Sequence, residues 1–130
     1  MLTIVLPTLR FLTLRWAAYD IPTTSAFVDL IRSLEELACL PNYIDHLVLT
    51  SLRSWSINDD LVNLDWKLLD RVLADRSGFP RLKKITIELL SGTEYATAED
   101  QAMLDMAKVT KFPQLCLATN DYLDFKFETL

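Results

Sequence analysis

The segment "FPRLKKITI", residues 79–87, contains the pattern that decides the fold. Apolar residues follow its proline at the second, fifth and seventh positions. "LPTLRFLTL", residues 6–14, repeats these offsets, and "LPNYIDHLVL", residues 40–49, repeats them with a shift of one residue. "FPQLCLATN", residues 112–120, begins in the same way and then departs from the pattern. A recurring unit of this kind predicts a chain built from similar segments packed in series.

The end of each unit has the alternation expected of a β-strand. Each unit ends in two aliphatic residues separated by one other residue, at residues 12–14, 47–49 and 85–87. Alternate residues of a strand point to the same face of a sheet, so these apolar pairs are predicted to face a shared core. Each proline-headed segment is therefore predicted to lead into a strand.

Three segments between these units have helical spacing of apolar residues. They are residues 23–40, 57–78 and 97–111. For the second of these helices we expect Asn58 as the N-cap and Gly78 as the terminator. Its apolar positions are predicted to share one face, and they are Leu61, Leu64, Leu68 and Val72.

Alternating strands and helices predict an α/β protein. Strands joined by helices come out parallel, so we expect a single domain, residues 1–130, with about four parallel strands alternating with three helices in a short solenoid resembling leucine-rich repeats. Residues 121–130, "DYLDFKFETL", are predicted to add a final strand that caps one end. Residues 1–9 are expected to leave the other edge uncapped, which favours a homo-oligomer.

The repeated segments resemble leucine-rich repeats, because residues 6–14 match L-x-x-L-x-x-L-x-L. Residues 63–89, with Trp66, Leu69 and Asp70 on a helix before a "FPxL" strand, are similar to the irregular leucine-rich repeats of fungal, basidiomycete-type F-box proteins. The resemblance covers roughly residues 1 to 117. It implies selection of protein substrates for a cullin-type ubiquitin ligase.

The sequence departs from this family at several points. The asparagine that usually follows the strand is replaced by residues such as Ala17 and Leu52, and the units are longer than ordinary leucine-rich repeats. The F-box that would join such a protein to the ligase is expected ahead of the repeats, and the sequence begins at the first repeat. We therefore expect either a fragment or a stand-alone repeat unit.

Composition narrows the possible classes of function. Hydrophobic residues make up 51% and charged residues 24% of the 130 residues, as in a packed protein. The net charge of −5, with scattered basic residues, argues against nucleic-acid binding, and two glycines argue against a phosphate-binding glycine loop. The apolar N-terminus is too short to span a membrane. Cys39 and Cys116 form no paired motif and are expected to be buried, which favours an intracellular, reducing compartment.

No residue cluster has the pattern of a catalytic or metal site. Asp45 precedes His46, the only histidine, but adjacent strand residues face opposite sides of a sheet. Cys39, Cys116 and His46 fit no common zinc spacing. The acidic residues are expected on solvated helix faces and first turns, and they are Asp59, Asp60, Asp65, Asp70, Glu99, Asp100 and Asp105. No cofactor is predicted.

The sheet face away from the helices is the candidate protein-binding face. Its residues lie between and beside the inward apolar positions, and two tryptophans are expected near one rim, since tryptophan is common at binding hot spots. The candidate residues are Phe11, Thr13, Arg15, Trp16, His46, Val48, Thr50, Trp55, Lys84, Thr86 and Glu88.

These observations favour a non-catalytic module that binds a protein or peptide partner. Two alternatives remain open. One is a small α/β enzyme with its site at the carboxyl ends of the strands. The other is a self-associating structural fragment.

Overall fold

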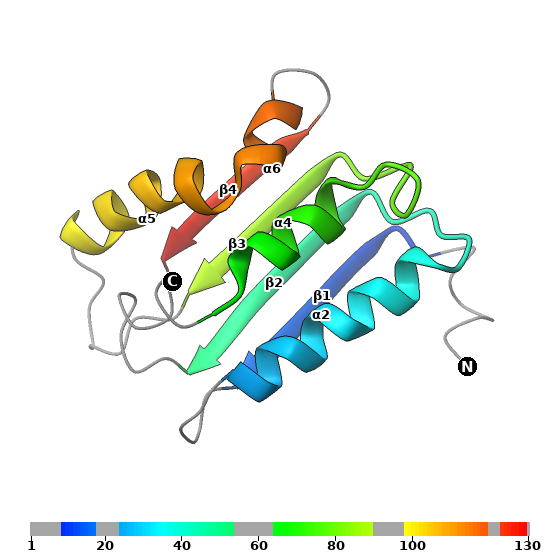
Figure 1. Cartoon of the computed structure of the whole chain (residues 1–130), viewed down its shortest axis with the longest axis horizontal. Coiled ribbons are helices and arrows are strands. Elements are labelled where there is room, and N and C mark those ends of the chain that lie inside the picture. The colour runs from blue at the N-terminus through cyan, green and yellow to red at the C-terminus, as the bar shows by residue number, and fades with distance from the viewer. Residues whose placement is uncertain (1–8, 18–23, 54–63, 90–97, 120–122, 130) are drawn as a thin grey trace.

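The computed structural model describes residues 9–17, 24–53, 64–89, 98–119 and 123–129. Strands and helices alternate along these residues, with two consecutive helices before the last strand (Figure 1). The elements are β1 (Phe11–Ala17), α2 (Thr24–Ala38), β2 (His46–Arg53), α4 (Trp66–Ala74), β3 (Lys84–Leu89), α5 (Ala98–Lys111), α6 (Pro113–Ala118) and β4 (Asp124–Thr129).

The strands form one four-stranded sheet in the order β1-β2-β3-β4, and every neighbouring pair is parallel. This order confirms the predicted α/β class with a parallel sheet. Helices connect strands that point the same way, because a parallel neighbour can be reached only by a long crossover. Figure 1 shows the described helices on one side of the sheet.

The core lies between the sheet and the helices. The predicted apolar pairs of β2 and β3 are fully buried: Leu47 and Leu49 lie in register with Ile85 and Ile87. Leu12 and Leu14 of the edge strand β1 pack against the same core and are half-buried. The inward direction predicted for all three pairs is therefore confirmed.

Helix α2 packs as its sequence predicts. Its buried residues are Phe27, Leu30, Ile31, Leu34 and Leu37, which recur at three- and four-residue steps along one face. The helix contacts β1 below it and α4 beside it.

Helix α4 differs from its prediction in both start and buried face. It begins at Trp66 and is capped by Asp65, whose carboxylate accepts a hydrogen bond from the Leu68 amide at 3.2 Å. The predicted cap, Asn58, lies outside the described residues. The helix buries Leu69 and Leu73, while Leu68 and Val72 are only half-buried.

The reason for this rotation of α4 is the position of Trp66. Its side chain is 1% exposed and packs edge-to-face against Phe27 and Phe112, with ring centroids 4.9 and 5.6 Å apart. Residues three and seven positions later lie on the same side of the helix as this ring. Burial of a tryptophan stabilises more than burial of a valine, so the larger side chain sets the orientation.

The segment at Pro113 is a helix, so the prediction of a strand entry there was wrong. Pro113 occupies the first turn of α6, where its missing N–H costs nothing. The buried carboxylate of Asp70 on α4 accepts hydrogen bonds from the Gln114 and Leu115 amides at 3.1 and 2.9 Å. The fourth strand is β4, which lies in the terminal segment predicted to form a final strand.

Asn42 joins two of the strand-entry loops. Its side-chain amide is 4% exposed and donates hydrogen bonds to the carbonyls of Leu37, Leu40 and Gly78, at 3.1, 3.1 and 2.9 Å. The loop before β2 is thereby tied to the C-terminus of α2 and to the loop before β3.

Candidate protein-binding face

The sheet face opposite the helices is polar and extends across all four strands. We call it the helix-free face. Its residues form three rows in strand register: Phe11, His46, Lys84 and Asp124; Thr13, Val48, Thr86 and Lys126; Arg15, Thr50, Glu88 and Glu128.

The structure therefore brings together most of the residues predicted for the binding face. The prediction missed the contribution of β4, namely Asp124, Lys126 and Glu128. The signal was present in "DFKFET", whose alternating phenylalanines mark the intervening residues as facing away from the core. These residues stand outside the proline-headed pattern from which the binding face was predicted, although their segment was predicted to form a final strand.

Exposure is uneven across the helix-free face. Phe11, on the edge strand, is 53% exposed, whereas Thr50 and Thr86, on central strands, are 8% and 7% exposed. Short side chains in the middle of a sheet are screened by longer neighbours in the same row. Thr50 also donates a hydrogen bond from its hydroxyl to Oε1 of Glu88, at 3.1 Å.

The charges of this face are balanced and separated along the third row. Arg15 lies at the β1 edge, and the two glutamates, Glu88 and Glu128, lie side by side on β3 and β4. Lys84 adds positive charge on the central strand β3, and Lys126 adds it on the other edge strand, β4. Such a surface is able to meet a complementary set of charges on a partner and thereby to fix its orientation.

His46 lies on this face against Phe11, with ring centroids 4.5 Å apart in an edge-to-face contact. Its Nε2 is buried and has no hydrogen-bond partner in the described part of the chain. Burial, and then the positive charge of Lys84, lower the pKa of His46, against the opposing effects of Asp45 and Asp124.

The structure does not pair His46 with Asp45. Asp45 lines a pocket at the amino ends of the strands together with Arg10 and Lys83, and no hydrogen bond joins the two side chains within the described residues. The imidazole therefore lacks the orienting carboxylate of an acid–base pair.

The predicted tryptophan pair is only partly described. The backbone of Trp16 is in register with Ser51, two positions after the Leu14–Leu49 pair. The side chain of Trp16 lies outside the described residues. Trp55 falls outside them altogether, as do most of the segments that follow β1, β2 and β3, where the alternative enzyme site was expected.

The cysteines and His46 are not brought together. Cys39 is exposed beyond the end of α2, which contradicts its predicted burial. Cys116 is half-buried on α6, and burial raises the pKa of its thiol. Among the residues that the structure describes, no group of three potential ligands is placed to hold a metal ion.

Asp70 departs from the solvated position predicted for the acidic residues, because it is only 1% exposed and caps α6. Burial raises the pKa of its carboxyl, and the two backbone hydrogen bonds from Leu115 and Gln114 oppose that rise. Asp65 and Asp105 are exposed as expected, while Asp59 and Asp60 lie outside the described residues.

Comparisons with protein family models, with curated proteins and with solved structures find no match to this chain. None of the described helices has the length and apolar character needed to cross a membrane. The fold and the helix-free face together define an α/β protein with a sequentially ordered, all-parallel sheet that is covered by helices on one side.

Proposed function

We propose that this chain is a non-catalytic module that binds a protein partner through the helix-free face. The observation that carries the proposal is the composition of that face. It combines an exposed aromatic ring, hydroxyl groups and charges of both signs over four adjacent strands. Protein interfaces use this mixture, with aromatic anchors and complementary charges at the rim.

We also propose that the strand–helix units form a short solenoid resembling leucine-rich repeats. The sequential strand order, the matching registers and the helices on a single side support this arrangement. In solenoids the curved sheet presents an extended binding surface. The resemblance to F-box proteins adds the proposal that the partner is a substrate of a ubiquitin ligase.

The test compares a charge-reversed face with a charge-reversed helix surface. Arg15→Glu with Lys126→Glu changes two exposed residues of the helix-free face, and Lys67→Glu with Arg71→Glu changes two exposed residues of α4 by the same amount. Each immobilised protein is used to capture partners from an extract, and cross-links are mapped by mass spectrometry. Circular dichroism checks that both variants fold.

We expect the native chain and the α4 variant to retain the same partner with cross-links to β1–β4, and the face variant to lose it. Retention of that partner by the face variant, or its cross-linking only to the helices, would contradict the proposal.

A further inference from the structure

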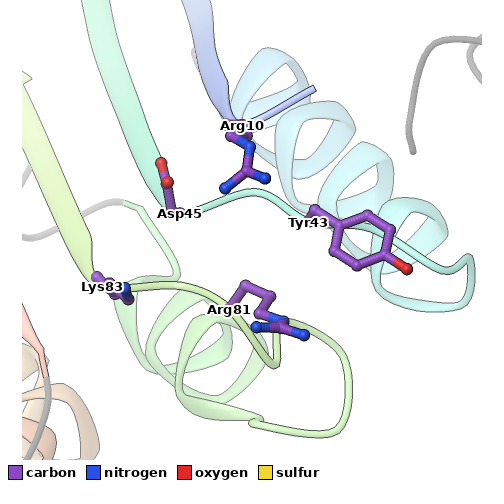
Figure 2. A pocket seen from close by; sticks show the side chains of 5 residues that line it. All are labelled: Arg10, Tyr43, Asp45, Arg81 and Lys83. Carbon is purple, nitrogen blue, oxygen red and sulfur yellow. The ribbon is translucent and has the colours of Figure 1, made fainter. Parts of the chain in front are cut away.

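Positive charge gathers at the amino ends of the strands, at a site distinct from the helix-free face. Figure 2 shows a pocket there that is lined by Arg10, Tyr43, Asp45, Arg81 and Lys83. Three cations and one carboxylate give this pocket an excess of two positive charges, although the whole chain carries −5.

Backbone hydrogen bonds between adjacent strands join three residues of this pocket. Arg10, Asp45 and Lys83 each immediately precede a strand of the sheet. The Asp45 amide donates to the Arg10 carbonyl, and the Lys83 amide donates to the Asp45 carbonyl, both at 2.8 Å. The three residues therefore lie in one row at the spacing of adjacent strands, about 4.8 Å.

Arg81 lies beside an aromatic ring. Its guanidinium carbon lies 5.8 Å from the centroid of the Tyr43 ring, within the range of a cation–π interaction. This contact leaves the N–H groups of the guanidinium available at the edges of the plane. In the described part of the chain, Arg10, Arg81 and Lys83 form no ion pair with an acidic side chain.

The pocket is open to solvent, since Arg10, Tyr43, Arg81 and Lys83 are exposed, and its size suits a compact group. Its volume is about 170 Å³, which is below the roughly 300 Å³ at which sites for drug-sized molecules begin. It is nevertheless several times the roughly 30 Å³ occupied by one water. A tetrahedral oxyanion fits between these limits.

We propose that this pocket binds a phosphate group. A phosphate monoester carries about −1.5 to −2 charges near neutral pH, which matches the excess positive charge of the pocket. The two guanidinium groups offer paired N–H donors to phosphate oxygens, and Lys83 adds a point charge. Asp45 repels the anion and therefore keeps the affinity moderate. The site does not depend on the function proposed for the helix-free face.

The test is a titration of the ¹⁵N-labelled chain with inorganic phosphate at pH 7.5 and constant ionic strength, followed by NMR. We expect saturable shifts of amides in residues 43–46 and 81–84. Arg81→Gln and Lys83→Gln are each expected to weaken binding about tenfold, because each removes charge-assisted hydrogen bonds. Asp45→Asn is expected to tighten it severalfold, and Lys67→Gln, at an exposed position on α4, is expected to leave it unchanged.

A second arm identifies the source of the phosphate. A mixture of phosphoserine peptides of random sequence is compared with the same mixture lacking phosphate and with inorganic phosphate. If the phosphorylated mixture binds more tightly than inorganic phosphate, the pocket is assigned to a phosphorylated protein segment. If the two bind equally, it is assigned to a small phosphate compound. The absence of saturable shifts with any phosphate probe overturns the proposal, as do equal affinities of Arg81→Gln, Lys83→Gln and Lys67→Gln.

Discussion

Gly78 shows how a single residue fixes the distance between two loops. A Cβ at this position would lie 2.7 Å from the Cβ of Ala38, well inside van der Waals contact. The absence of a side chain also allows the Gly78 carbonyl to approach the Asn42 side chain, at 2.9 Å. Gly78 is four residues beyond the end of α4, so its role is close packing against α2 rather than the helix termination predicted from the sequence.

This contact predicts a coupled pair of substitutions. Gly78→Ala should lower the free energy of unfolding by about 1–3 kcal/mol. The new Cβ would overlap the Cβ of Ala38, which is fixed to the helix backbone and cannot move aside by rotating a side chain. Ala38→Gly alone should cost up to about 1 kcal/mol. The double variant should lose less stability than the sum of the losses in the two single variants.

Urea denaturation of the two single variants and the double variant measures this coupling. Additive losses would contradict the packing role of Gly78, since independent sites add. Ala102→Gly, at an exposed position in α5, serves as the control for the helix propensity of glycine.

At the scale of elements, the cap of α6 comes from another helix. Asp70 accepts from two amides in the first turn of α6, whose own N-cap residue, Phe112, makes no side-chain cap hydrogen bond. A carboxylate at a helix N-terminus is also favoured by the helix dipole. The short helix α6 is therefore stabilised by α4.

Asp70→Ala is predicted to destabilise the protein by about 1–3 kcal/mol, because the Gln114 and Leu115 amides lose their acceptor. Faster amide hydrogen exchange of Leu115 should accompany this loss. Asp105→Ala, at an exposed position on α5, is the control and should change stability by less than about 0.5 kcal/mol. Equal losses in the two variants would contradict the cap.

The same residue predicts a pH dependence with a definite sign. Burial raises the pKa of Asp70 in the folded state above its ordinary value near 3.9, so the folded state holds this proton more tightly than the unfolded state does. The contribution of Asp70 to stability is therefore largest below its ordinary pKa and decreases as the pH rises through the raised value. The free energy of unfolding of the native chain, minus that of Asp70→Asn, should therefore decrease from pH 4 to pH 7 in urea denaturation. An increase of this quantity with pH would contradict the assignment.

At the scale of the whole molecule, the sheet ends at two edge strands. Within the described residues nothing pairs with the outer side of β1, and Phe11 on that strand is 53% exposed. Unpaired strand edges are templates for association with another chain. The predicted contribution of residues 1–8 to this edge lies outside the described residues.

We predict a homodimer through the β1 edge. Light scattering should give a mass above 14.9 kDa that increases with concentration. Phe11→Lys should shift the equilibrium toward the monomer, since lysine on an edge strand opposes pairing. Met106→Lys, which places the same charge at a 76% exposed site on α5, should leave association unchanged. A native chain that stays monomeric at high concentration would contradict the prediction.

By itself, the sequence determined the alternation of strands and helices, the parallel sheet and the direction of the apolar pairs. Leu47, Leu49, Ile85 and Ile87 were predictable because two-residue periodicity is a local property of the chain. The same alternation marked Thr13, Arg15 and Glu88 as residues of the helix-free face.

Only the tertiary structure decided the features that depend on neighbours distant in sequence. Leu68 and Leu69 are equally apolar, and the ring of Trp66 among Phe27 and Phe112 selects which of them is buried. Pro113 suits either a strand entry or a helix start, and the carboxylate of Asp70 stabilises the helix. The phosphate pocket likewise joins Arg10 to Arg81, which become neighbours only when the strands pair. Local spacing carries periodicity, whereas packing partners and converging charges arise from contacts that no local pattern contains.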